Sequence, residues 1–231
     1  MSNLVLAVDT GLNNMGFAIF DWDTKEIVDF GYLNLKKRKK DRKPYYDHYT
    51  IHFENLEIDK EVELGVSRMT PEIIIRMIRR WISTVKKHYA NITRVYIDDY
   101  IYTLGRKVLS QLAELNGLYF SLFHLYFPGV KLIKVGPSAK SRHIGAMIPK
   151  EFSSKSKKYQ LRDKKLRKEI MVKQVVKIIL SSEYDIDPDE FPHDTADAIA
   201  LGYYAVHKDP PGIGVGKKRK KKKRRKRQIK I

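Results

Sequence analysis

The sequence predicts an α/β fold, with a mixed five-stranded sheet flanked by helices. Three observations lead to this prediction. Short apolar runs typical of strands alternate along the chain with longer segments that suit helices. The strand-like runs come first and are then interleaved with helices, which favours a mixed sheet with helices on its faces. The 231 residues, of which 42% are hydrophobic, are enough for one sizeable domain.

The first half of the chain predicts three strands in a meander, then a helix and a fourth strand. For the helix, Thr70 is a suitable N-cap and Pro71 a suitable first residue, and the pattern continues to about Tyr89. Residues 36–68 are polar and charged, so we expect an inserted loop of irregular structure there. The apolar runs that predict the strands lie at residues 4–9, 15–23, 24–35 and 92–98.

The second half predicts three helices and the fifth strand. A basic stretch at residues 150–168 leads into the second of these helices. The helices are expected at residues 107–126, 167–182 and 193–208, and the strand at residues 130–135. Pro210 and Pro211 then end the domain, which we place at residues 1–208. Residues 209–231 are expected to be a disordered polybasic tail, because they cannot bury apolar surface.

Composition points to an intracellular protein with a polyanionic partner. Lys and Arg number 46 against 27 Asp and Glu, a net charge of +19. The basic run at residues 217–227 holds only eleven of these charges, so the folded part is basic as well. There is no cysteine, which excludes disulfides and thiolate metal sites. No apolar run approaches the roughly 18–20 residues that span a bilayer, so we expect a soluble, non-secreted protein.

Four aspartates are candidates for a metal-dependent active site. Asp9 and Asp98 each end a predicted strand, and Asp194 and Asp197 lie one turn apart at the start of the last helix. Strand ends of an α/β sheet meet at one edge, so these side chains can converge. Carboxylates without neutralising lysines would repel one another unless divalent cations lie between them. Oxygen ligands favour Mg²⁺, with Mn²⁺ as a substitute, and two such ions catalyse phosphodiester hydrolysis.

Each acid also has a simpler interpretation when it is taken alone. Asp9 could begin a turn, and either Asp98 or Asp99 could be a polar strand end. Asp194 could be an N-cap and Asp197 a first-turn acid that stabilises the helix dipole. The joint pattern, rather than any single acid, favours an active site.

That joint pattern resembles the RuvC-like Holliday junction resolvases of the ribonuclease H-like superfamily. Their Asp-x-Gly turn between two apolar strands corresponds here to VLAVDTGLNNMGFAIF. Their second acid, usually Glu, corresponds to Asp98 in VYID, and the spacing from Asp98 to Gly117 in QLAELNGLYF favours it over Asp99. Their Asp-x-x-Asp-Ala helix start corresponds to HDTADAIALGYYA, and their strand-Pro-x-x-Lys element to VGPSAK.

The resemblance implies a structure-selective DNA endonuclease that resolves four-way junctions by paired nicks, with two Mg²⁺ ions per active site and no small-molecule cofactor. The basic stretch before the long helix is most similar to the resolvases of poxviruses, iridoviruses and related large DNA viruses. If the protein is viral, we expect it in the nucleus or at a cytoplasmic replication site. No membrane partner is expected.

A homodimer is expected, because a four-way junction is two-fold symmetric and needs two matched nicks. The apolar helix around Leu112, Leu115, Tyr119 and Phe123 is the candidate interface. The alternative is that this helix is buried inside one subunit.

Several basic residues are candidates for contacts with DNA phosphates. They are Arg106, Lys107, Lys140, Arg142, Lys164, Lys165 and Arg167. His193 has two interpretations, a group that assists the reaction beside Asp194 or an ordinary helix-start residue. The polybasic tail is either a DNA-binding arm or a nuclear localisation sequence.

Other functions share parts of the pattern. The string VDTG resembles the turn of aspartic proteases, but those are β-rich and need two such turns. Sugar kinases and actin-like ATPases share an Asp-x-Gly turn but need a longer, duplicated chain. An RNA–DNA hybrid hydrolase, a terminase-type nuclease and a non-catalytic DNA-binding module of the same fold remain alternatives.

Overall fold

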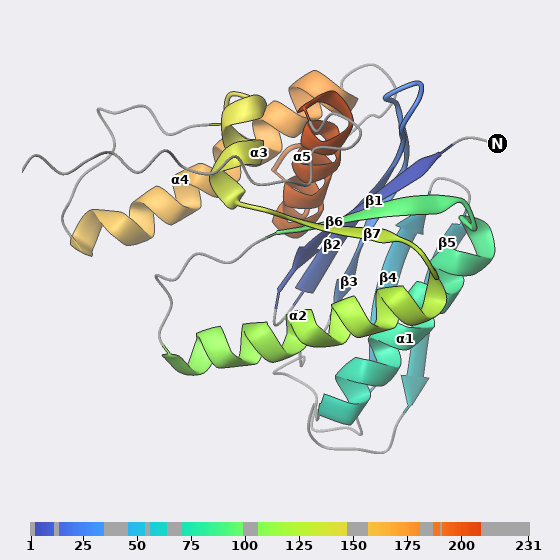
Figure 1. The fold of residues 1–231 in the computed structure, drawn as a ribbon. Coiled ribbons are helices and arrows are strands. Elements are labelled where there is room, and N and C mark those ends of the chain that lie inside the picture. Colours follow the sequence, from blue (N-terminus) through green and yellow to red (C-terminus); the bar gives the residue numbers. More distant parts are fainter. Residues whose placement is uncertain are drawn as a thin grey trace, which may run out of the picture.

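The computed structural model shows one central sheet with helices on both faces (Figure 1). It describes residues 3–11, 14–34, 46–53, 56–63, 71–98, 106–146, 157–180, 187–189 and 191–208. The strands are β1 (Leu4–Thr10), β2 (Asn14–Asp21), β3 (Ile27–Asn34), β4 (Tyr46–Phe53), β5 (Leu56–Glu63), β6 (Ile92–Asp98) and β7 (Lys131–Val135). The helices are α1 (Pro71–His88), α2 (Arg106–Tyr126), α3 (Pro137–His143), α4 (Lys157–Val175) and α5 (His193–Lys208), and a π-helical turn at Val176–Leu180 continues α4.

The main sheet has five strands in the order β3-β2-β1-β6-β7. The first three strands form the antiparallel meander, and β6 and β7 then run parallel to β1. The predicted mixed five-stranded α/β sheet with flanking helices is therefore confirmed. Because β1 and β6 are parallel neighbours, their carboxyl ends lie side by side at one edge of the sheet.

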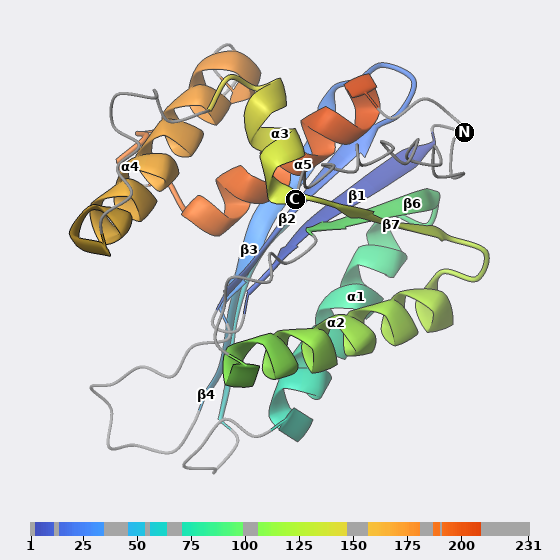
Figure 2. The same cartoon turned by 60° about the vertical axis from the view of Figure 1, so that its left-hand side comes forward.

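Alternate residues of each strand point to opposite faces, and each face has its own core. On one face, Leu4, Leu6 and Val8 of β1 pack with Trp81 of α1 and Phe123 of α2. On the other face, β1 contributes Val5 and Ala7 to a second cluster that includes residues of α4 and α5. Figures 1 and 2 show the resulting layers, with α1 and α2 on one side of the sheet and α3, α4 and α5 on the other.

Helix α5 lies very close to the sheet, which explains why glycine occupies two of the contact positions. A Cβ added at Gly16 of β2 would lie 1.8 Å from the backbone oxygen of Asp194, and one at Gly202 would lie 2.4 Å from the ring of Phe20. Thr195 adds a hydrogen bond of 3.2 Å from its hydroxyl to the carbonyl of Gly31 on β3. These contacts fix where the first turn of α5 begins.

The expected irregular loop at residues 36–68 is wrong for part of its length. The chain forms an antiparallel hairpin there, in which β4 pairs with β5 from Tyr46–Glu63 to Phe53–Leu56. The segment LEIDKEVE alternates apolar residues with acidic ones except at Lys60, and the segment YDHYTIHF is rich in aromatic and β-branched residues. Both features favour strands. The high charge of the segment obscured these features.

Two helices also differ from the prediction. Helix α4 begins at Lys157, ten residues before the expected start at Arg167. The added segment KKYQLRDKKL consists mostly of Lys and Leu with one Arg and one Gln, all of which have good helix propensity. The short helix α3, which begins at Pro137 directly after β7, was not predicted as a helix. Proline is well suited to the first turn of a helix.

The proposed dimer interface on α2 is wrong for the residues whose side chains the structure describes. Leu115, Tyr119 and Phe123 are buried in the core of the single chain, so they are not available to a second subunit. The side chain of Leu112 lies outside the described residues. None of the helices in the described ranges is both long and apolar enough to cross a lipid bilayer.

Candidate active site

Asp9 and Asp98 lie on adjacent strands and point to the same face of the sheet. In β1, Asp9 lies on the same face of the strand as Val5 and Ala7, whose side chains pack in the cluster with α5. In β6, Asp98 lies on the same face of the strand as Tyr96, whose side chain belongs to the same cluster. The strands pair in parallel up to Val8 and Ile97, so the two aspartates follow side by side. Strand alternation and register therefore bring both carboxylates under the helices α3 and α5.

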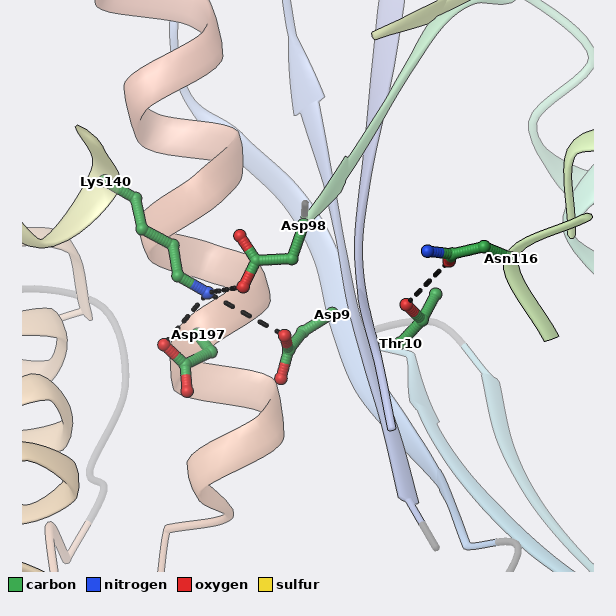
Figure 3. Close-up of polar contacts among 6 residues, drawn as sticks. All are labelled: Asp9, Thr10, Asp98, Asn116, Lys140 and Asp197. Atoms are coloured by element: carbon green, nitrogen blue, oxygen red, sulfur yellow. Dashed lines mark hydrogen bonds and ion pairs between the residues drawn. The ribbon is translucent and has the colours of Figure 1, made fainter. Parts of the chain in front are cut away.

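Two further side chains complete the cluster, one from α5 and one from α3 (Figure 3). Asp197 lies in the second turn of α5, and Lys140 lies in α3. The Nζ of Lys140 is 2.6 Å from Asp98 Oδ2, 3.0 Å from Asp197 Oδ1 and 3.8 Å from Asp9 Oδ1. Three carboxylates from three different elements thus surround one ammonium group.

The cluster lies largely out of water, and its charges perturb one another. The side chain of Lys140 is only 2% exposed, whereas those of Asp98 and Asp197 are 12% and 26% exposed. Burial raises the pKa of Asp9 and of Asp98, an effect that the positive charge of Lys140 opposes. The negative charges of Asp197, Asp98 and Asp9 together outweigh burial at Lys140 and raise its pKa, so its ammonium stays protonated.

The carboxylates fit the requirements of a hard divalent cation. Mg²⁺ and Mn²⁺ prefer oxygen ligands, and the acids supply them from directions that already converge on one positive charge. The Oδ1 atom of Asp98 is buried, and no hydrogen-bond partner for it exists among the described residues. Within those residues, no three acids or histidines are close enough together to hold a metal ion as they stand. Lys140 occupies the place between the carboxylates.

The fourth predicted acid, Asp194, lies one turn before Asp197 on α5. Its side chain is partly exposed, and no ion pair in the described part of the chain joins it to Lys140. The structure therefore brings Asp9, Asp98 and Asp197 together around Lys140 and leaves Asp194 beside them. His193, the first residue of α5, is also partly exposed, and its Nδ1 has no partner among the described residues. Asp99 lies outside the described residues.

The predicted DNA-binding residues differ widely in their surroundings. Lys140 departs from the expectation of a surface contact, because its ammonium lies within the carboxylate cluster. Arg142 and Arg167 are exposed on α3 and α4. Arg106 and Lys107 lie in the first turn of α2, and Lys164 and Lys165 lie in α4, but their side chains fall outside the described residues, as does the tail at residues 209–231.

A hydrogen bond behind the acids was not predicted from the sequence. The hydroxyl of Thr10, the residue after Asp9, donates to Oδ1 of Asn116 on α2 at 3.1 Å (Figure 3). Both residues are buried. Strand alternation alone indicates that Thr10 faces away from Asp9, towards α2. A buried asparagine in the apolar segment QLAELNGLYF was the only other indication of such a partner.

Comparisons with known proteins support the fold. No family model and no curated protein sequence matches the chain. Among solved structures, RuvC from Thermus thermophilus in complex with a Holliday junction substrate matches with a TM-score of 0.50 and 14% identity, covering 88% of this chain and 92% of RuvC. The Holliday junction resolvase of yeast mitochondria matches with a TM-score of 0.49 and 14% identity, over 89% of this chain and 78% of that one.

The resolvase of fowlpox virus matches with a TM-score of 0.43 and 11% identity, covering 88% of this chain and 97% of that one. Likenesses at this level do not identify a viral origin, which stays a prediction. The match to RuvC carries the argument about the fold, and its coverage extends over almost the whole length of both chains. This protein therefore has the fold of the RuvC-like resolvases, as its motifs predict.

Proposed function

We propose that this protein is a metal-dependent endonuclease that hydrolyses phosphodiester bonds in branched DNA. One observation carries the proposal. Asp9, Asp98 and Asp197 come from two parallel strands and a helix, yet their carboxylates converge on a single positive charge. Three largely buried acids raise the free energy of the folded state unless positive charge compensates them, and Lys140 supplies only one positive charge for the three carboxylates. Such a cluster at the carboxyl edge of a sheet favours a functional site over a structural one.

The chain's own residues have distinct roles in this proposal. Asp9, Asp98 and Asp197 would hold Mg²⁺ or Mn²⁺, and Asp194 is proposed as a further ligand from the solvent side. Two such ions, when bound, activate water and stabilise the leaving oxygen of a phosphodiester. Thr10 and Asn116 fix the strand end from behind, so that Asp9 does not need to reorganise when the substrate binds.

DNA as the substrate is supported by charge and by fold. The chain carries a net charge of +19, and Arg142 and Arg167 are exposed on the helices that cover the site's face of the sheet. Four-way junctions are the proposed form of DNA, since the chain shares its fold with a RuvC that was solved with a junction. We also propose a symmetric dimer, because one chain carries one set of acids and resolution needs two nicks.

The test is a cleavage assay on matched substrates. The purified full chain is incubated with a synthetic four-way junction, the corresponding linear duplex and an RNA–DNA hybrid, first with Mg²⁺ and then with Mg²⁺ plus EDTA. Paired nicks in the junction that EDTA abolishes are the expected result. Preferential cleavage of the hybrid would favour a hybrid hydrolase, and cleavage of linear duplex alone would favour a terminase-type nuclease. Binding without any cleavage would leave the chain as a DNA-binding module.

The dimer is tested on the same substrates. Analytical ultracentrifugation of the protein with the junction is expected to give two subunits per junction, with both nicks on symmetric strands of a supercoiled cruciform. A stable one-to-one complex that makes single nicks would contradict both the dimer and the resolvase activity.

A further inference from the structure

Lys140 has the position and the charge of a cation that the carboxylates would otherwise hold. Its ammonium lies within 2.6 to 3.8 Å of oxygens from Asp98, Asp197 and Asp9, and the whole side chain is 2% exposed. A lysine is rarely buried to this extent unless it is paired. In this structure the three carboxylates provide that pairing.

An ammonium and a divalent cation cannot share this place. Both would need the same oxygen atoms, and like charges a few ångströms apart in a largely dry site repel strongly. The Lys140 side chain has a flexible four-carbon stem, so its charge can leave the cluster without unfolding the sheet. A displaced ammonium still needs an anionic partner, because a charge that is left unpaired away from water is strongly unfavourable.

The phosphate of bound DNA is the anion that the proposed function brings to this place. The cluster is open to solvent mainly at Asp197, whose side chain is 26% exposed, and at Asp9, at 18%. A phosphodiester that approaches the acids from there would come within reach of the same lysine. Arg142, two residues after Lys140 on α3, is exposed and adds positive charge on that helix.

We propose that Lys140 is a resident counter-ion that a divalent cation displaces, and that the phosphate of bound DNA then takes the displaced ammonium as its partner. This inference rests on the proposed function, of which it is a refinement. Under this arrangement the divalent cation binds weakly to the free protein and strongly to the DNA complex. The cation and the DNA therefore each increase the affinity of the protein for the other. The arrangement also explains how one lysine can be buried in the resting protein and still contact DNA.

The first test measures metal affinity without DNA. Ca²⁺, a hard cation with oxygen ligands, is titrated calorimetrically into the full-length wild type and into Lys140→Met, which keeps the stem and removes the charge. We expect Lys140→Met to bind Ca²⁺ about tenfold more tightly, equivalent to about 1.4 kcal/mol. Lys87→Met, an exposed lysine of α1 on the opposite face of the sheet, is the matched control and should leave the affinity unchanged. Equal or weaker binding by folded Lys140→Met would overturn the proposal.

The second test needs no variant and therefore does not depend on whether Lys140→Met folds. The wild type is treated briefly with an amine-acetylating reagent, with and without saturating Ca²⁺, and acetylation of each lysine is measured by mass spectrometry. The reactivity of Lys140 should rise at least fivefold when Ca²⁺ is bound, whereas that of Lys87 should not change. Unchanged protection of Lys140 at saturating Ca²⁺ would show that the two cations do not compete.

The third test separates this inference from the proposed function. Ca²⁺ affinity is measured with and without a four-way junction, and the ratio is compared between wild type and Lys140→Met. Coupling between ligands typically changes an affinity by about 5–150-fold. The increase in Ca²⁺ affinity caused by the junction should be smaller in Lys140→Met, because the DNA phosphate then has no lysine to pair with. Equal ratios, together with Mg²⁺-dependent cleavage by the wild type, would refute the role of Lys140 and leave the nuclease intact. Absence of both metal binding and cleavage would refute both.

Discussion

The hydroxyl of Thr10 donates a hydrogen bond of 3.1 Å to Oδ1 of Asn116, from the face of β1 opposite to the carboxylate of Asp9. One strand end thus presents a candidate metal ligand to one layer of helices and a fixed polar contact to the other. We therefore expect the position of Asp9 to depend in part on this contact on the opposite face of the strand.

Thr10→Val tests this dependence, because valine keeps the shape and removes the hydroxyl. The buried Asn116 would lose a donor, which costs about 1–3 kcal/mol of unfolding free energy. We expect slower junction cleavage with little change in DNA affinity. Thr93→Val is the control, since Thr93 is an exposed strand residue whose hydroxyl makes only a 3.5 Å contact. Denaturant unfolding and cleavage rates measure both effects, and equal losses in the two variants would contradict a specific role for Thr10.

Asn substitutions of the acids should separate cleavage from binding. Asp9→Asn, Asp98→Asn and Asp197→Asn should each lower the cleavage rate about a thousandfold or more, because metal ions supply several kcal/mol of transition-state stabilisation. DNA affinity should stay the same or rise, since repulsion between carboxylate and phosphate is removed. Asp23→Asn, at an exposed turn, is the control.

Asp194→Asn examines the fourth acid by the same assay. We expect a loss similar to that of Asp197→Asn. A folded variant that keeps normal turnover would remove Asp194 from the site and leave the three acids around Lys140.

Gly16→Ala should displace the start of α5. The added Cβ would lie 1.8 Å from the Asp194 backbone oxygen, so the helix or β2 must move. Overpacking of this kind typically costs about 1–3 kcal/mol, and cleavage should fall as Asp197 shifts. Gly117→Ala on α2 is the matched control, because its Cβ meets no atom within 4 Å and alanine favours a helix by about 0.5–1 kcal/mol. If Gly16→Ala unfolds at the wild-type temperature, the close approach is not required.

Stability should fall in mildly acidic solution, in part through His143. The pKa of His143 is lowered mainly by burial and further by the charges of Lys208 and His207. The unfolded chain therefore takes up the proton first as the pH falls below about 6.5, and the folded state loses stability until its own lower pKa is passed. His143→Gln should show a smaller drop in melting temperature between about pH 7.5 and pH 5.5. An identical drop in both proteins would assign the effect to other groups.

Deletion of residues 217–231 tests the tail, which lies outside the described residues. Each lost phosphate contact should reduce the slope of log K against log salt by about 0.9 on duplex DNA. Cleavage at saturating protein should be unchanged. Binding measured across a salt series decides the matter, and an unaltered slope would favour a localisation role.

Local patterns in the sequence predicted the sheet and its acids, but not the contacts between distant segments. The alternation at Val5, Ala7 and Asp9 and the acid at the end of β6 are local, so the shared edge could be inferred. Lys140 was predicted to contact DNA because a basic side chain can neutralise a phosphate, and only the packing of α3 against α5 reveals its burial. The hairpin β4–β5 was missed because charge concealed its alternation.

The acids and the lysine of the cluster come from distant parts of the chain, since Asp9 is in β1, Asp98 in β6, Lys140 in α3 and Asp197 in the last helix. A growing polypeptide therefore cannot form this centre until α5 has docked. Contacts so far apart in sequence form late and carry a large loop-closure cost, so a cation that binds only the complete centre would stabilise only the fully folded molecule. Chains truncated before α5 would lack Asp197 and therefore the complete centre, so we expect them to have no nuclease activity.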